Sequence, residues 1–306
     1  MSERFGRHVK RLADKALAVG LALACVFATL IYAAPSAAAE TPQPAKLRAE
    51  TVAAFERDVR LTDERNEKEL KRGTALLWID SLPSDERAAA YAAMKRGEVE
   101  IQQLTTLDHG QPIECPGGMI HHWVGAVFIP GAKLEDVQDV LEDYDHQSVY
   151  YAPDVERSKI ESRDGDHFRV FLRFRRHKVI TVVLDTEHDV HYFHDGPGRA
   201  HSRSSAVRIA EVENPGQSDE SELKLGDDGG FLWGMETWWR MEEGDGGVYV
   251  QSEVDSLTRD IPTGLGWLVG PFVTSIPKET LAFTLEATRK TVSGKINKYS
   301  EGGMAR

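Results

Sequence analysis

The chain has 306 residues, of which 41% are hydrophobic and 28% are charged, a composition typical of a globular protein rather than a disordered or fibrous one. Its 37 Lys and Arg residues are outnumbered by 49 Asp and Glu residues, which gives a formal net charge of -12. This balance argues against a nucleic-acid partner, because phosphate binding requires a basic face. Two cysteines are too few for a disulfide framework or a zinc ribbon.

The first 39 residues have the pattern of an export signal. Basic residues precede an uncharged run over residues 16–34, and the small residues Ala37 and Ala39 suit a signal peptidase. We therefore expect residues 1–39 to be a signal peptide and the protein to be periplasmic or extracellular. Because residues 16–34 are also long enough to span a bilayer, the alternative is a protein anchored to the inner membrane by this segment.

Residues 40–118 are predicted to be a linker followed by a helical preface. Residues 46–72 are charged and contain neither Pro nor Gly, which predicts one or two amphipathic helices. Ser84 is a good N-cap for an Ala-rich helix that continues to about Arg96. A strand is expected over residues 98–106. The sequence does not indicate what the preface does.

From residue 119 onward the sequence is rich in predicted strands. Residues 119–129 favour a strand, the apolar spacing of residues 133–143 predicts a helix, and residues 144–151 predict a second short helix or turn. The remaining strands are expected to form an antiparallel meander over residues 155–162, 167–176, 179–194, 199–212, 231–241 and 248–257.

Two of these strands alternate strongly between apolar and polar positions. Residues 167–176 have an apolar side chain at every second position, which predicts one buried face. Residues 231–241 are expected to place a larger apolar set on one face, namely Phe231, Trp233, Met235, Trp239 and Met241.

A long helix is predicted at the end of the chain. Pro277 fits its first turn, where the missing N–H costs nothing, and an apolar stripe follows through Leu281, Leu285 and Val292 to about residue 297. This helix and the strands must bury their apolar faces together. We therefore predict an α+β fold in which a curved antiparallel β-sheet grips a long C-terminal helix, with an N-terminal helical preface.

Six motifs stand out in this part of the chain, namely Val124–Pro130, Leu134–Val137, Leu141–Tyr144, Pro153–Val155, Trp238–Arg240 and Asp260–Gly264. They resemble those of the START-like (SRPBCC) superfamily, the helix-grip fold of polyketide cyclases, coenzyme Q-binding proteins and lipid-transfer domains. The resemblance covers residues 119–297 and leaves residues 298–306 as a disordered tail. It implies an apolar ligand held between the sheet and the long helix. Because the sequence has no nucleophile elbow, no H-E-x-x-H motif and no paired cysteines, we expect a binding protein without catalytic residues.

Large side chains with the inward parity, or on the elements that would close the cavity, are the candidate ligand contacts. Aromatic groups beside such a gap suit a lipid, a quinone or a polyketide-like molecule. No cofactor is expected. The candidates are Tyr144, Tyr150, Tyr151, Phe168, Leu172, Phe174, Trp233, Met235, Trp239, Trp267, Leu281 and Leu285.

The connector over residues 261–272 is rich in glycine and apolar residues. Its glycines do not fit a dinucleotide-binding loop, and no lysine follows as in a phosphate loop. The connector is expected to be either a buried link or a gate, and Trp267–Val269 could make transient contact with a membrane surface.

The sequence gives little support for a metal site or for catalysis. His188, His191, His194 and His201 do not converge on adjacent strands as metal ligands must, so we expect a solvated polar face and no metal site. The alternative function is an enzyme of the cyclase or hydrolase type using polar groups such as Tyr144, His122 and Arg173, whose spacing is not diagnostic. A third alternative is a periplasmic interaction scaffold whose core is filled by its own side chains.

Overall fold

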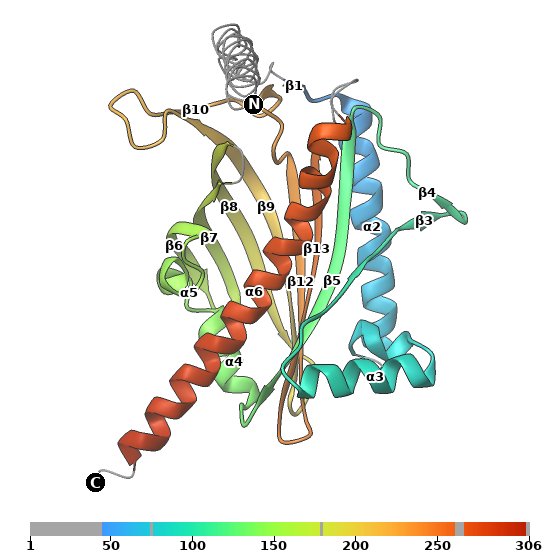
Figure 1. Ribbon diagram of the computed structural model, residues 1–306, viewed down its shortest axis with the longest axis vertical. Coiled ribbons are helices and arrows are strands. Elements are labelled where there is room, and N and C mark those ends of the chain that lie inside the picture. Colours follow the sequence, from blue (N-terminus) through green and yellow to red (C-terminus); the bar gives the residue numbers. More distant parts are fainter. Residues whose placement is uncertain (1–44, 74–75, 178–179, 261–265, 304–306) are drawn as a thin grey trace, which may run out of the picture. The chain divides into compact units, whose positions relative to one another are not determined.

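The computed structural model describes residues 45–73, 76–177, 180–260 and 266–303 (Figure 1). The predicted signal peptide or anchor therefore lies outside the described residues. Among the described helices, none has an apolar stretch long enough to cross a bilayer.

One antiparallel sheet dominates the structure, in the order β2-β5-β13-β12-β9-β8-β7-β6, with the short β10 pairing with β9 (Figure 1). The meander predicted from the sequence is confirmed. Two small strand pairs lie outside this sheet: β1 (Ala45–Lys46) with β11 (Asp227–Asp228), and β3 (Leu107–Asp108) with β4 (Gln111–Pro112). The strands of the large sheet are β2 (Glu100–Gln103), β5 (Gly118–Pro130), β6 (Val155–Asp164), β7 (His167–His177), β8 (Thr181–His194), β9 (Arg199–Glu213), β10 (Ser221–Glu222), β12 (Gly234–Gly244) and β13 (Gly247–Arg259).

The long C-terminal helix α6 (Gly266–Gly303) crosses one face of this sheet and packs chiefly against β5 (Figure 1). Two short helices, α4 (Leu134–Leu141) and α5 (Gln147–Tyr150), pack beside it. The main apolar core lies between these helices and the sheet and includes Leu281 and Leu285 of α6. The predicted α+β helix-grip fold is therefore confirmed.

Helix α6 is longer than predicted. The expected start near Pro277 is wrong, because the helix begins at Gly266 and contains both Pro271 and Pro277. Two prolines and two glycines in residues 266–277 lower the helix propensity of this stretch, which therefore resembles a turn-rich connector in the sequence. The helix also continues to Gly303, through most of the segment expected to be a tail. Residues 261–265 of the expected gate lie outside the described residues.

The helical preface covers the opposite face of the sheet. Helix α2 (Ala49–Arg72) is a single helix, and it ends at Gly73, whose left-handed φ of 68° lets its N–H bond the carbonyls of Glu69 and Leu70. Helix α3 (Ser84–Lys95) and the turn η1 (Trp78–Ser81) follow. Their apolar side chains form a second cluster with Phe128 and Tyr249 of the sheet.

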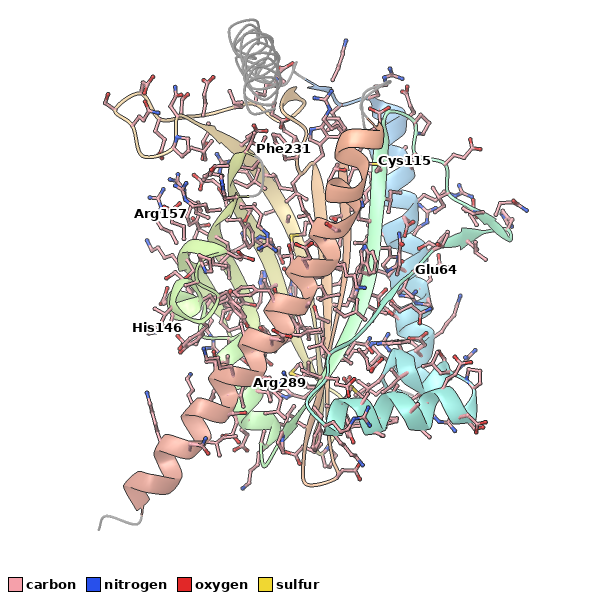
Figure 2. All side chains as sticks on the ribbon, in the orientation of Figure 1. Glu64, Cys115, His146, Arg157, Phe231 and Arg289 are labelled. Carbon is pink, nitrogen blue, oxygen red and sulfur yellow. The ribbon has the colours of Figure 1, made fainter. Side chains whose placement is uncertain are left out.

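The preface is also joined to the sheet through its own backbone. Its strand β2 pairs with β5, and Gly118 is already part of β5. Cys115, labelled in Figure 2, is half-buried beside α2, with its Sγ atom 3.9 Å from the Thr51 carbonyl oxygen. Burial raises the pKa of this thiol to about 11. The preface is thus a second layer on the sheet.

Candidate ligand-binding face between the sheet and helix α6

The face of the sheet toward α6 can be followed strand by strand, because residues directly opposite each other in an antiparallel pair point to the same side. Trp239 on the central strand β12 is paired with Ser202 of β9 and with Ser252 of β13. Ser252 is in turn opposite Gly125 of β5. A Cβ atom at Gly125 would lie 2.8 Å from Leu285 Cδ1, so the missing side chain lets α6 approach the sheet at this level.

The structure gathers most of the predicted ligand contacts on this side. The main core cluster contains nine of them or has them packed against it: Tyr144, Tyr150, Tyr151, Phe168, Leu172, Phe174, Trp239, Leu281 and Leu285. Met235 has the same strand parity as Trp239 and is half-buried. The side chain of Trp267 lies outside the described residues.

Trp233 does not lie with the other predicted ligand contacts on the α6 face of the sheet. The expectation that Phe231 and Trp233 share a strand face with Trp239 is wrong, because both precede the start of β12 at Gly234. Trp233 packs with Phe55 of α2 and Leu257, and its Nε1–H donates to Asp228 at 2.9 Å. Strand alternation therefore does not apply to it.

Three aromatic side chains on the α6 face are only half-buried, namely Trp123 of β5, Phe174 of β7 and Trp239 of β12. Strand β12 lies between β9 and β13, so its edges are fully paired. The exposure that remains on Trp239 therefore lies on the face toward α6. The helix does not completely cover the aromatic side chains in this part of the sheet.

Unpartnered polar atoms lie on the same face of the sheet, two of them on residues directly opposite Trp239. Ser202 Oγ, Ser252 Oγ and Trp123 Nε1 are buried and have no hydrogen-bond partner. A buried polar group without a partner costs about 1–3 kcal/mol, so such groups call for an explanation. All three can donate a hydrogen bond. They offer separate hydrogen-bond donors, on β9, β13 and β5, to oxygen atoms of a mainly apolar molecule lying against Trp239.

Two buried histidines add uncharged polar groups to this face. His188 of β8 has Nε2 at 2.9 Å from Thr186 Oγ1, and burial lowers its pKa to about 4. His121 of β5 has Nε2 at 3.0 Å from Thr258 Oγ1, and burial lowers its pKa as well. Both therefore hydrogen-bond as neutral imidazoles near pH 7.

The pKa of His188 predicts a specific loss of stability in acid. The ordinary value of 6.5 applies to the unfolded chain and the value of about 4 to the folded one, so the unfolded chain binds the proton first. The contribution is complete above pH 6.5 and falls by up to about 3 kcal/mol as the pH drops to 4. In urea unfolding at several pH values, His188→Gln should lose less stability over this window than the wild type.

The matched control is His194→Gln, because the His194 side chain is 59% exposed. This variant should follow the wild-type pH profile. Equal pH slopes for His188→Gln and the wild type would contradict the assignment of His188 as a buried neutral group.

Two tyrosine hydroxyl groups between the sheet and the helices have hydrogen-bond partners, unlike the serines near Trp239. Tyr144 Oη lies 2.8 Å from Tyr192 Oη, and Tyr151 Oη lies 2.9 Å from Thr288 Oγ1 of α6. Both tyrosines are buried in the main core. The first hydrogen bond thus joins the segment between α4 and α5 to β8, and the second joins the end of α5 to α6.

The structure does not bring together the polar groups considered for catalysis. Tyr144 lies in the main core, whereas His122 lies under α2 and forms a 2.6 Å hydrogen bond with Glu253. Arg173 makes a two-point hydrogen bond with Asp185, at 2.6 Å for each contact, and belongs to the opposite strand parity from Phe174.

The predicted histidine group is also dispersed. His188 is buried, whereas His194 lies near Asp166 and His201 pairs with Asp195. His191 instead stacks on His167 with ring centroids 4.0 Å apart, and Asp189 lies within hydrogen-bond distance of both.

An open hollow lies between β9 and β10, away from the histidines and from the predicted ligand contacts. Its lining includes Val207, Ile209, Leu223 and Leu225.

Sequence reasoning missed the polar contacts on the α6 face, chiefly Ser202, Ser252 and Trp123. The signal that could have found the serines is their parity. Each is opposite Trp239 once the hairpins are aligned, and small hydroxyl residues on the apolar parity of a strand are unusual. Without the register, however, neither serine can be assigned to a particular neighbour.

No family model and no curated protein matches the chain. Solved structures do. A STAR-related lipid transfer protein fragment from Xanthomonas axonopodis is 20% identical, with 62% of this chain and 98% of that chain covered at a TM-score of 0.40. Human STARD10 is 11% identical, with 74% and 85% covered at a TM-score of 0.40. The Zhui aromatase/cyclase from a Streptomyces species is 14% identical, with 59% and 95% covered at a TM-score of 0.37.

These similarities concern the fold, which the sheet order and the packing of α6 establish independently. The solved structures that this chain resembles include a STAR-related lipid transfer protein and aromatase/cyclases, which belong to groups that its motifs also resemble.

Proposed function

We propose that this protein is exported and holds an apolar small molecule, such as a lipid, a quinone or a polyketide-like compound, between the sheet and α6 without changing it chemically. The observation that carries the proposal is the half-buried Trp239 flanked by the unpartnered hydroxyl groups of Ser202 and Ser252. The aromatic ring supplies apolar contact, and the hydroxyl groups supply hydrogen-bond donors on either side of it for oxygen atoms of the ligand.

The binding energy in this proposal comes from removing apolar surface from water. Each Å² of apolar surface that is buried contributes roughly 25 cal/mol, so a molecule of lipid size is retained without a covalent bond. The neutral state of His188 and His121 is compatible with such a ligand, because neither imidazole introduces a charge into the interface. Binding would then be selective for molecules that combine a large apolar body with a hydrogen-bond acceptor.

The proposal is tested on the full chain produced with its N-terminal segment and purified from the cell envelope. Native mass spectrometry is expected to show a bound small molecule, and organic extraction should release a compound with an oxygen-bearing group. The protein mass should equal that of a chain beginning at Glu40, since the signal is expected to end at Ala39.

Export and ligand binding would be contradicted by different results. An intact N-terminus in the membrane fraction would favour the anchored alternative. Protein that carries no small molecule, and that does not bind a fatty acid or a quinone added to it, would contradict ligand binding and favour the scaffold alternative.

A further inference from the structure

A group of buried ionisable side chains lies on the other face of the sheet, beneath α2. His122 of β5 and Asp255 of β13 are opposite each other in the strand register. Asp58 of α2 faces them, and one candidate ligand atom from each of the three residues lies within 4.8 Å of the others. All three side chains are buried. This group is separate from the face on which we place the apolar ligand.

The imidazole of His122 is held in one orientation. Its Nε2 atom lies 2.6 Å from Glu253 Oε1, and Glu253 also pairs with Arg65 of α2. Its Nδ1 atom lies on the other side, 3.2 Å from Thr106 Oγ1 and 3.7 Å from Asp58 Oδ1, so an ion bound there would replace the contact with Thr106. Metal-binding histidines commonly donate one ring N–H to a carboxylate, which directs the lone pair of the other nitrogen toward the ion. Glu253 therefore occupies the position of such an orienting carboxylate.

The buried carboxylate group of Asp255 also indicates a bound cation. The Asp255 side chain is 0% exposed, and neither of its carboxylate oxygens has a hydrogen-bond partner. The carboxylate of Asp58 faces it across the group, with candidate ligand atoms of the two residues within 4.8 Å of each other. A carboxylate in such a place requires either a proton or a cation beside it.

Asp58 has neutral partners and one histidine. Its Oδ1 atom accepts hydrogen bonds from Thr106 at 2.5 Å and from Thr62 at 3.4 Å. Within the part of the chain that the structure describes, no Lys or Arg forms an ion pair with Asp58 or with Asp255. Arg65 and Arg240, the nearby arginines, are paired with Glu253 and Glu69. The two aspartates thus leave negative charge without a matching basic side chain.

We propose that Asp58, His122 and Asp255 bind a divalent transition-metal cation, such as Zn²⁺, that fastens α2 to the sheet. One imidazole nitrogen and two carboxylate oxygens form a ligand set suited to such an ion. Its two positive charges offset the two aspartates. Because the ligands come from α2, β5 and β13, the ion joins the preface to the two strands beneath it and acts in folding.

The experiment uses the full chain, freed of metal with a chelator and then titrated with Zn²⁺. Elemental analysis should find about one zinc ion per chain, and a hundredfold excess over the dissociation constant should raise the midpoint of thermal unfolding by roughly 5–10 °C. Asp255→Asn preserves the shape of the side chain and removes a ligand charge. This variant should lose both the bound zinc and the zinc-dependent shift.

Two further variants serve as controls. Asp228→Asn changes another buried carboxylate, one that accepts hydrogen bonds from Trp233 and Gly230, and should keep the zinc-dependent shift. His191→Gln alters the more exposed group formed by His167, Asp189 and His191, the other described set of residues with metal-ligand geometry. It should also keep the shift.

Two results would overturn the proposal. If the wild type binds no zinc and shows no shift while Asp255→Asn is more stable than the wild type, the two aspartates share a proton instead. If Asp255→Asn retains zinc and His191→Gln loses it, the ion binds at the exposed group.

Discussion

Replacing Trp239 with glutamate is expected to abolish retention of the apolar ligand in a protein that still folds. Trp239 lies on a fully paired central strand, faces α6 and remains half-buried. An unpaired carboxylate against an apolar molecule costs several kcal/mol, and each 1.4 kcal/mol lowers affinity about tenfold. We therefore expect a loss of more than a hundredfold, measured as ligand extracted per mole of protein by mass spectrometry.

The matched control is Phe193→Glu, because Phe193 is 44% exposed and the same change there leaves the α6 face intact. This variant should retain the ligand as the wild type does. Circular dichroism and the urea midpoint establish that both variants are folded. A folded Trp239→Glu protein that carries the wild-type amount of ligand would show that the ligand lies elsewhere.

A double variant, Ser202→Ala with Ser252→Ala, tests the polar part of the same face without adding a charge. Removing two buried hydroxyl groups that lack partners should leave the ligand-free protein at least as stable as the wild type. Affinity for an oxygen-bearing ligand should fall by about tenfold, the equivalent of one lost hydrogen bond. Unchanged affinity would remove these hydroxyl groups from the site.

The largest expected effect on stability is that of Arg240→Ala. The Arg240 side chain is 2% exposed, and from β12 it reaches Glu69 and Asn66 of α2 and the carbonyl oxygen of Leu76. Truncation leaves Asn66 and the Leu76 carbonyl buried without this donor, and Glu69, which is 31% exposed, without its cation. Because Arg240 itself is buried, we expect a cost of about 3 kcal/mol, the lower end for a broken buried pair. Urea unfolding should show this decrease in the free energy of unfolding.

Arg208→Ala is the control for the loss of an arginine. The Arg208 side chain, which pairs with Glu187 and Glu222, is 39% exposed. An exposed pair contributes up to about 1 kcal/mol, so this variant should remain close to the wild type. If Arg240→Ala were no less stable than Arg208→Ala, the contacts between α2 and the sheet would not stabilise the fold.

The strands were predictable because their sequences alternate. Phe168, Val170 and Leu172 are buried at every second position of β7, as the period of two requires. Helix α4 was equally predictable from the spacing of Val137, Val140 and Leu141, which are all buried. Local patterns of this kind depend only on near neighbours in the chain.

The second buried face was not predictable from these patterns. Gln251, Glu253 and Asp255 form the polar side of β13, yet each is at most 2% exposed because η1 and α2 cover them. The same holds for α2, whose buried stripe contains Asp58, Thr62 and Asn66 among its apolar residues. Burial of polar residues depends on partners that are distant in the sequence, so hydrophobicity alone does not reveal it.

The candidate site was predictable in part. The inward aromatic residues of β7 and Tyr144 were assigned from their own segments and lie in the main core. Trp233 was assigned from a strand that starts one residue later, at Gly234, and its real neighbours, Phe55 and Leu257, are set by tertiary packing. The unpartnered hydroxyl groups of Ser202 and Ser252 became visible only with the strand register.

The most direct test of ligand binding against Trp239 is photo-crosslinking with a fatty acid that carries a diazirine in its chain, followed by peptide mapping. We predict labels in β12 around Trp239 and in the parts of β9 and β13 that contain Ser202 and Ser252, with competition by unlabelled fatty acid. Labelling confined to the outer surface, such as the hollow between β9 and β10 near Val207 and Leu225, would contradict this account.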